Sequence, residues 1–319
     1  MARGRGPALG LALALSALGT ALPGTAAAGA YRDELTFLGR TTFLLREYAL
    51  VVPTDLKRQP VPEGTFLEIK AWGAWNGKWV PYVYEPLTVP GVGPEDVNAI
   101  MAKYRSLRPD SGLTIRKAQD NGFLLRSEKG GSVFELAAEP AAPGLTAENP
   151  EGRLSLGLAD GKLTVRGQTI PGRVVRIAVT PGPRSDPSGL YGLYDHLTLQ
   201  LASGAALVVY HSRTKPGFNL VALLAPDGRG DRQSRQVEVA WRKRARDGES
   251  GRDIPTGWSV QSRELGLRAD LDEWGRNLVH YKTPAGKSAV VSNAMVRGTV
   301  ELDGARLDAF GLNVHVQDE

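Results

Sequence analysis

Residues 189–213 read GLYGLYDHLTLQLASGAALVVYHSR, and this stretch decides the fold. Four leucines and Asp195 alternate with more polar residues from Leu193 to Leu201. Because successive side chains of a strand point to opposite faces, this alternation predicts a strand with one apolar face. Ala202-Ser203-Gly204 then predicts a tight turn into a second strand, LVVYH. The stretch therefore predicts an antiparallel hairpin with one buried face.

The same alternation recurs along most of the chain, in short runs separated by Gly, Pro, Asn and Asp. Period-two patterning at this spacing predicts an all-β protein, built as an antiparallel sandwich or barrel. Asn76-Gly77, Asp160-Gly161 and Asp303-Gly304 each stand between two such runs and predict hairpin turns.

One short helix is expected, over Pro94–Ser106. Its apolar residues are spaced three and four apart: Val97, Ile100, Met101 and Tyr104. Proline at the first helical position and acidic residues in the first turn are typical of a helix start, and Arg108-Pro109 ends the segment. We expect the apolar stripe of this helix to cover one end of a barrel.

Residues 1–30 have the composition of a secretory signal peptide. Arg3 and Arg5 precede an apolar run, and small residues allow cleavage after Ala28 or Ala30. We expect a cleaved signal and a secreted, periplasmic or cell-envelope location, with an uncleaved N-terminal anchor as the alternative. No later stretch has about 18 consecutive apolar residues, so no transmembrane segment is expected in the mature chain.

The length of 319 residues allows one large domain or two ordinary ones. Two stretches rich in Pro, Gly and Ala are candidate linkers, Glu139–Pro150 and Thr180–Gly189. We place the boundary in the second, which predicts an N-terminal domain over 31–183 and a C-terminal domain over 184–319.

The composition excludes several kinds of chemistry. The chain has no Cys, so disulfides, thiolate zinc sites, iron–sulfur clusters and cysteine nucleophiles are ruled out. Only four His remain, and we expect neither a metal nor a cofactor. The net charge of +5 falls by two when the signal is removed, which is too weak to indicate nucleic-acid binding. The adjacent acids Asp33-Glu34 are expected at the surface.

Asp195 is the candidate catalytic residue because it stands in an otherwise apolar row. Burial there raises the pKa of a carboxyl unless a partner offsets it, and such a group can act as a general acid or anchor a ligand hydroxyl. The alternative is a carboxylate hydrogen-bonded to backbone near the strand start. Tyr194, His196 and Gln200 share the opposite face and are candidate ligand-binding residues.

A second candidate site is aromatic. Trp72, Trp75 and Trp79 span one predicted hairpin, and Tyr84 follows them. Three tryptophans supply a broad, rigid and amphipathic surface, which suits a planar or polyene ligand or a stacked sugar. The alternative is an aromatic core with cross-strand pairing.

Residues 194–213 resemble a motif of the carotenoid 1,2-hydratase/AttH-like family, WDWFSLQLDDGRELMLYRLR. The identical positions are Asp195, Leu199, Gln200, Leu201, Gly204, Leu207, Tyr210 and Arg213. Trp258, followed by Glu-Leu-Gly-Leu at 264–267, and VRGTVELDG at 296–304 are similar to later stretches of that family.

The resemblance implies two tandem lipocalin-like β-domains that handle isoprenoids or polyketides, in hydration, cyclisation or cycloaddition. It covers about 130 residues well and the N-terminal half loosely. Members carry a Ser-Trp-x-Asp-(His/Arg)-Glu motif before the aligned segment, where this chain has VTPGPRSDPSG at 179–189. Asp195 is therefore the single carboxyl that the resemblance carries over, and Trp258 joins the candidate ligand-binding residues.

Three functions follow as expectations. The first is an exported module that binds an apolar small molecule, such as an isoprenoid or lipid, inside a β-domain or at the inter-domain cleft. The second is a cofactor-free hydratase or cyclase with Asp195 as its acid. The third is an envelope-associated interaction domain with filled interiors and no pocket. The oligomeric state does not follow from the sequence.

Overall fold

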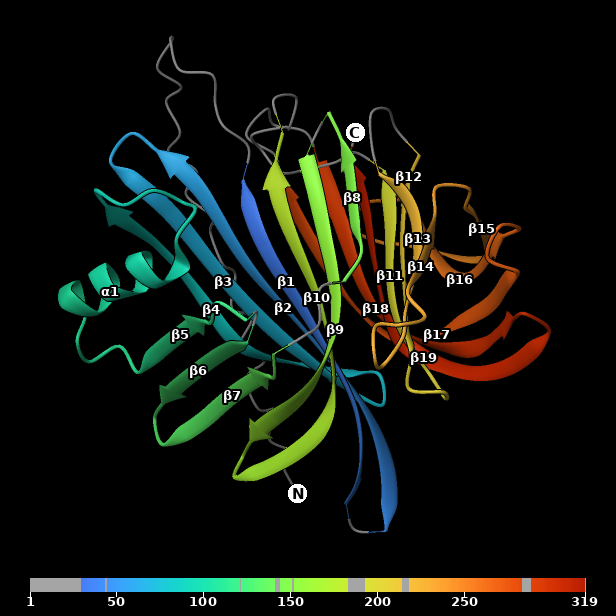
Figure 1. Cartoon of the computed structure of the whole chain (residues 1–319), viewed down its shortest axis with the longest axis horizontal. Helices are drawn as coiled ribbons and strands as arrows, with labels where there is room; N and C mark the ends of the chain where they lie inside the picture. Colours follow the sequence, from blue (N-terminus) through green and yellow to red (C-terminus); the bar gives the residue numbers. More distant parts are fainter. Residues whose placement is uncertain are drawn as a thin grey trace, which may run out of the picture.

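The computed structural model describes residues 30–43, 45–120, 122–140, 144–150, 152–182, 193–213, 218–282 and 288–318. These residues form one helix, α1 (Val97–Leu107), and two antiparallel sheets, each of which curls into a half-barrel (Figure 1). The all-β prediction with one short helix is confirmed. The predicted signal peptide, apart from Ala30, and most of the predicted inter-domain linker lie outside the described residues, so export and the domain boundary stay predictions.

The first sheet has ten strands in the order β4-β3-β2-β1-β10-β9-β7-β6-β5, with β8 paired to β9. Its strands are β1 (Tyr31–Phe43), β2 (Arg46–Val61), β3 (Gly64–Trp75), β4 (Lys78–Pro90), β5 (Leu113–Lys117), β6 (Phe123–Lys129), β7 (Ser132–Ala138), β8 (Thr146–Asn149), β9 (Gly152–Val165) and β10 (Gln168–Pro181). Part of the candidate linker 139–150 is thus strand β8 of this sheet.

The second sheet has nine strands in the order β14-β13-β12-β11-β19-β18-β17-β16-β15. They are β11 (Tyr194–Leu201), β12 (Ala206–Ser212), β13 (Asn219–Leu224), β14 (Arg232–Ser234), β15 (Glu238–Arg246), β16 (Asp253–Ser262), β17 (Leu267–Lys282), β18 (Ser288–Leu302) and β19 (Ala305–Asp318). The quoted stretch forms the β11–β12 hairpin, as its pattern predicts.

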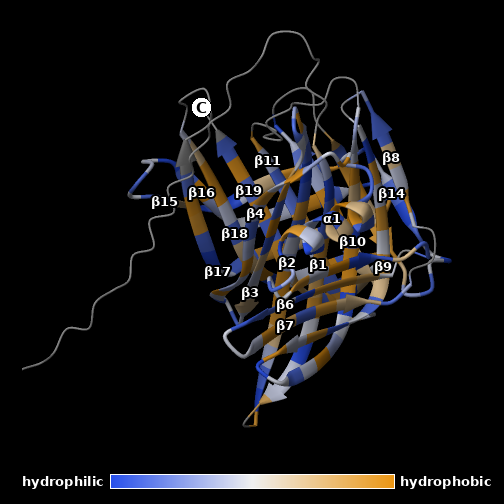
Figure 2. Cartoon of the chain, turned by 90° about the vertical axis from the view of Figure 1, so that its left-hand side faces the viewer, coloured by the Kyte–Doolittle hydropathy of each residue, from blue (hydrophilic) through white to orange (hydrophobic). Residues whose placement is uncertain are grey.

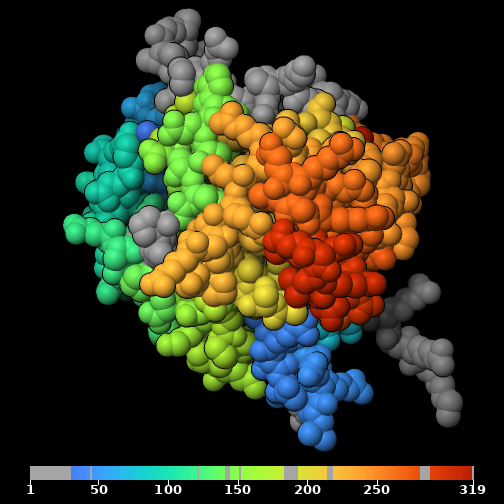
Figure 3. Space-filling model, turned by 45° about the vertical axis from the view of Figure 1, so that its right-hand side comes forward, coloured from blue at the N-terminus to red at the C-terminus, as the bar shows by residue number. Residues whose placement is uncertain are grey.

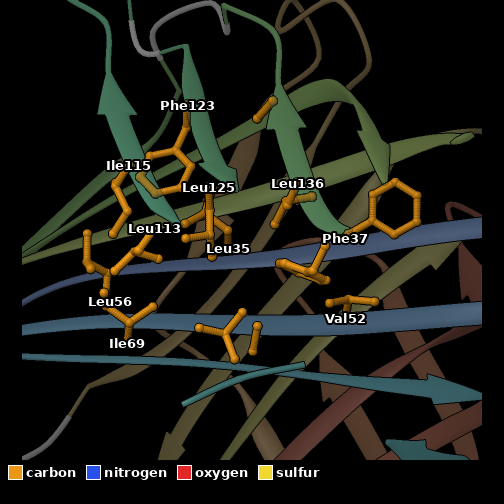
Figure 4. Packing of buried hydrophobic residues seen from close by; sticks show 14 of the residues in the cluster. Leu35, Phe37, Val52, Leu56, Ile69, Leu113, Ile115, Phe123, Leu125 and Leu136 are labelled. Carbon is orange, nitrogen blue, oxygen red and sulfur yellow. The ribbon is translucent and has the colours of Figure 1, made fainter. Parts of the chain in front are cut away.

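Each half encloses its own apolar core. In the N-terminal half, residues such as Leu35, Phe37, Val52, Ile69 and Leu125 interdigitate between the strands (Figure 4). The apolar stripe of α1 packs onto this core, as predicted. In the C-terminal half, the leucines of β11 pack against Trp258 and residues of β17 and β18. Figure 2 shows that hydrophobic and hydrophilic residues alternate along the strands, so that the two faces of one strand differ in polarity.

A third core joins the two halves. It consists of outward-facing residues of both sheets, among them Val51, Leu156 and Ile177 from the first and Val208 and Leu312 from the second. The halves therefore pack sheet against sheet in direct contact (Figure 3). At one edge of this interface, the Asn76-Gly77 turn lies against Gly275 of β17, where a Cβ on Gly275 would stand 2.2 Å from the carbonyl oxygen of Gly77.

Three of the four predicted hairpin turns are confirmed, including Ala202-Ser203-Gly204 between β11 and β12, and one is wrong. Asn76-Gly77 and Asp303-Gly304 form turns in which all four residues have positive φ. Asp160-Gly161 instead lies inside the continuous strand β9, which turns at Arg166-Gly167. A Cβ on Gly161 would lie 2.4 Å from the Val174 side chain, so glycine here permits a close approach within the sheet.

The helix begins three residues later than the sequence predicts. The side chain of Asp96 caps it by accepting hydrogen bonds from the amides of Asn98 and Ala99, at 2.8 and 3.0 Å. Pro94 therefore lies in the preceding loop, where its carbonyl accepts a hydrogen bond from Arg58. Within the described part of the chain, no helix combines the length and apolarity needed to cross a membrane.

Candidate functional site

Strand β11 presents two different chemical surfaces. Asp195 lies on the face that carries Leu197, Leu199 and Leu201 into the C-terminal core. His196 lies on the opposite face, toward β1 of the first sheet. The alternation predicted from the sequence therefore holds, and it divides the candidate residues between a barrel interior and the cleft between the halves.

Three ring N–H groups hold the carboxylate of Asp195. Nε1 of Trp241 donates to Oδ2 at 2.8 Å, while Nε1 of Trp258 and Nδ1 of His315 donate to Oδ1 at 3.2 and 3.1 Å. Asp195, Trp258 and His315 are fully buried. Nε of Arg213 approaches Oδ2 to 3.7 Å.

These partners reverse the pKa shift expected for Asp195. Burial by itself raises the pKa, but the hydrogen bond and charge of His315, with the two indole N–H groups, bring the pKa of Asp195 below its ordinary value. A carboxyl that is ionised at neutral pH has no proton to give. The alternative of a hydrogen-bonded carboxylate is the one that the geometry favours, although its donors are side chains rather than backbone.

Reasoning from the sequence predicted none of the three partners of Asp195, since Trp258 was named as a ligand-binding candidate. His315 stands in β19 directly opposite Asp195, a register that depends on strands 120 residues apart. The one local signal is a histidine within the alternating run from residue 306 to 316. Such a histidine indicates a buried polar partner without identifying it.

The cleft face of β11 meets Glu34 of β1. The hydroxyl of Tyr210 donates to Oε2 of Glu34 at 3.1 Å, and Nδ1 of His196 lies 3.7 Å from the same oxygen. The rings of His196 and Tyr210 stack at 4.1 Å with an interplanar angle of 11°. Nε2 of His196 lies 3.2 Å from the hydroxyl of Thr198.

The electrostatics of this cluster differ from those around Asp195. Burial, reinforced by the nearby charge of Asp55, raises the pKa of Glu34 to about 7, against the opposing effects of Arg32 and Tyr210. Burial lowers the pKa of His196 to about 3, so its imidazole is neutral at neutral pH. Glu34, which also lies 3.7 Å from Nη1 of Arg32, can therefore exchange a proton near pH 7 while the imidazole of His196 stays neutral.

A pocket opens beside this cluster. Its lining includes Glu34, Tyr194, His196 and Tyr210 on the polar side and Leu154, Val179 and Phe218 on the apolar side. The enclosed volume is about 50 Å³. We call this space the cleft pocket.

Asp33-Glu34 were expected at the surface, and this is wrong. Asp33 is only 3% exposed and forms ion pairs with Arg58 and Lys117 at 2.6 and 2.8 Å. Its position is in phase with Leu35 and Phe37, which face the N-terminal core. The sequence could have indicated this burial, because residues two apart on a strand share a face and Asp33 is two residues before Leu35.

The structure does not bring the aromatic candidates together. Trp75 packs in the N-terminal core and donates to the hydroxyl of Tyr82 at 2.6 Å, whereas Trp79 packs in the inter-domain core and donates to the carbonyl of Gly275 at 3.3 Å. Trp72 is half-buried and stands three residues before Trp75, so strand alternation puts the two on opposite faces, and Tyr84 lies beside Lys70. The alternative of core and cross-strand packing describes Trp75 and Trp79.

Tyr194 and His196 line the cleft pocket, while Gln200 lies farther along β11 and Trp258 is enclosed in the C-terminal core. Ligand binding by each of these residues stays a prediction. Among the described residues, no group of three or more His, Asp or Glu side chains is arranged to hold a metal ion.

Comparison with solved structures identifies relatives of the fold. A protein assigned as AttH from Nitrosomonas europaea superposes with a TM-score of 0.58 at 14% identity, over 93% of this chain and 98% of that one. Kievitone hydratase from Nectria haematococca gives a TM-score of 0.59 at 12% identity, over 91% and 89%. The chain shares their fold. At identities this low, the comparison shows the fold alone. The superposition confirms the predicted fold class of two tandem lipocalin-like β-domains. No family model and no curated protein sequence matches the chain.

Proposed function

We propose that the chain binds a largely apolar small molecule, such as an isoprenoid, lipid or polyketide-like compound, with one end in the cleft pocket. The observation that carries this proposal is a pocket with an apolar wall and a few convergent polar groups, Glu34, His196 and Tyr210. Pockets that enclose a whole drug-sized ligand measure roughly 300–1,000 Å³. A space of about 50 Å³ therefore takes only the end of such a molecule.

Binding is tested by titrating the full chain with an apolar fluorescent dye and with farnesol, and by native mass spectrometry of the farnesol mixture. Val179→Trp places an indole in the pocket wall and is expected to weaken binding about tenfold or more, since the apolar surface is then occupied. Val279→Trp is the control, because Val279 is 38% exposed and does not line the pocket.

Equal binding by both tryptophan variants would contradict the proposed location. A wild-type chain that binds neither dye nor farnesol would contradict the function itself. That result would favour the third expectation, an interaction domain with filled interiors.

A second candidate function is acid–base catalysis without a cofactor, as in a hydratase or lyase. The observation that favours it is the pKa of about 7 at Glu34, beside an apolar wall. Protonated Glu34 would transfer its proton to an alkene carbon of the ligand and leave a carbocation. Water would then add to the cation and return one proton to the Glu34 carboxylate, so that the net reaction is alkene plus water giving an alcohol.

In this candidate function the acid is Glu34 rather than Asp195. Of these two carboxyls, Glu34 has a pKa near neutral pH, whereas the pKa of Asp195 is lowered. The test incubates the chain with isoprenoid alkenes in H₂¹⁸O and detects the labelled alcohol by mass spectrometry. Glu34→Gln is expected to lower the rate by about 10²-fold or more. An unchanged rate in this variant would eliminate Glu34 as the acid.

Export is a proposal that rests on residues 1–30 alone. The positive start, apolar run and small residues before Ala28 and Ala30 support a cleaved signal peptide. Mass spectrometry of the protein recovered from the medium or cell envelope is expected to give an N-terminus at Gly29 or Tyr31. Recovery of the chain with residues 1–30 intact would contradict cleavage.

A further inference from the structure

A second cavity lies against strands β1, β9 and β10. Its volume is about 350 Å³, and its lining includes Asp33, Leu35, Ser155 and Arg176 with the segment 144–146. Arg176 is paired in register with Leu35, whose side chain belongs to the N-terminal core. Arg176 and Leu35 therefore point to the barrel side of these strands, and Glu34 from the opposite face also contributes to the lining. We call this space the barrel-mouth cavity.

Arg176 is a buried cation with an unsatisfied N–H donor at Nη1. The residue is 9% exposed, and its Nη1 is buried with no hydrogen-bond partner among the described residues. No described carboxylate lies within ion-pair distance of it. A guanidinium stays charged in proteins and a buried donor without an acceptor is costly, so an acceptor supplied by a ligand would stabilise Nη1.

The nearest carboxylates are already engaged. Asp33 receives Arg58 at its Oδ2 and Lys117 at its Oδ1. Asp120, whose charge also acts on Arg176, accepts the amide of Gly122 at 3.1 Å. This end of the barrel therefore gathers three cations, Arg58, Lys117 and Arg176, around the single buried carboxylate of Asp33.

The cavity supplies space for the missing acceptor. Segment 144–146 packs against β9 so closely that a Cβ on Gly144 would lie 1.8 Å from the carbonyl oxygen of Leu156, and this approach walls the cavity on one side. Gly157, opposite Arg176 in the register, contributes no side chain to fill it. Leu35 and Leu145 add apolar surface beside the polar Ser155 and Thr146.

We propose that the barrel-mouth cavity binds the oxyanion group of a small organic acid, with the guanidinium of Arg176 as its hydrogen-bond donor. A planar guanidinium fits a carboxylate or a phosphate through two parallel N–H bonds. The apolar lining accommodates the carbon skeleton of the acid. Glu34 borders both this cavity and the cleft pocket, but Arg176 lines this cavity and not the cleft pocket, while Val179 lines the cleft pocket and not this cavity, so variants of the two residues test the two sites separately.

The test compares three C8 probes on the full chain by calorimetric titration and thermal unfolding. Octanoate and octyl phosphate carry the oxyanion, whereas octanol carries the same chain without charge. Octanoate or octyl phosphate, or both, are expected to bind and raise Tm, with an affinity at least about tenfold above that of octanol. Their relative affinities identify a carboxylate or a phosphate as the preferred group. Equal binding of all three probes, or of none, would overturn the proposal.

Arg176→Gln removes the donor and is expected to reduce the affinity for the preferred probe to that of octanol. The matched control is Arg173→Gln on the same strand, because Arg173 pairs with Asp160 at 2.7 Å on the other face. Removing an unpaired buried charge should leave Tm unchanged or higher in the absence of a probe. Unchanged probe affinity in Arg176→Gln would overturn the assignment of Arg176. If this variant does not fold, the contrast between the charged probes and octanol in the wild-type chain decides.

Discussion

Two buried carboxylates on adjacent sheets show opposite electrostatic behaviour. Asp195, inside the C-terminal half, accepts three N–H hydrogen bonds, and its pKa is below the ordinary value. Glu34, in the cleft, accepts a hydrogen bond from the hydroxyl of Tyr210 and lies near Arg32, and its pKa is about 7. Burial raises the pKa in both places; at Asp195 the ring N–H donors outweigh burial, whereas at Glu34 the charge of Asp55 adds to burial and outweighs Arg32 and Tyr210. Asp195 therefore contributes to stability, and Glu34 is available for proton exchange.

The largest expected effect comes from Asp195→Asn. This change removes the negative charge that faces the buried His315. It also places an amide N–H group, itself a donor, against the N–H donors of the three rings. We expect a loss of about 3–5 kcal/mol in the free energy of unfolding, measured by urea denaturation at pH 7. Because the pKa of Asp195 is lowered by folding, its contribution is present above the unfolded pKa and is lost as the pH falls below about 4.

The matched control is Asp270→Asn, at a carboxylate 38% exposed that pairs with Arg242 and Arg268. Exposed pairs contribute about 0–1 kcal/mol, so this variant should stay close to wild type. Equal losses in the two variants would show that the cluster around Asp195 has no special weight.

A smaller effect of opposite sign is expected for Glu34→Gln. Folding raises the pKa of Glu34 from 4.5 to about 7, so the unfolded state ionises first and the wild-type chain loses stability between these pH values. The Gln variant should lack this loss. With allowance for a side chain 21% exposed, we expect it to exceed wild type by about 2 kcal/mol at pH 8 and to match it near pH 4. Urea denaturation across this range is the measurement, and parallel curves for the two proteins would contradict the raised pKa.

The smallest effect on stability is expected for Tyr210→Phe. This variant tests how far the hydroxyl donor of Tyr210 lowers the pKa of Glu34. The phenyl ring keeps the stack on His196, while Glu34 loses the hydrogen bond that lowers its pKa. The pKa of Glu34 should rise further, as followed by the carboxyl band in infrared difference spectra, with a stability cost of about 1 kcal/mol at pH 8. A pKa that stays the same or falls would show that the Tyr210 hydroxyl does not stabilise the Glu34 carboxylate.

Local patterns predicted the elements well because alternation and turn residues act over a few positions. The β11–β12 hairpin, the apolar stripe of α1 and the two faces around Asp195 and His196 all follow from adjacent residues. Long-range register decides what the same patterns cannot show. Asp195 meets His315, and Glu34 meets Tyr210, across 120 and 176 positions. The turn predicted at Asp160-Gly161 was wrong for the same reason. Glycine is required there by the close approach of Val174 on the neighbouring strand, which the local sequence does not show.

The contact between Gly77 and Gly275 fixes the orientation of the two halves at one edge. Backbone meets backbone there, and a Cβ on Gly77 would lie 2.5 Å from the carbonyl oxygen of Trp274. Any side chain at either position would wedge the halves apart and change the angle between them, while each apolar core stayed whole. Variation at these two glycines would tune the width of the cleft without touching a residue that lines it.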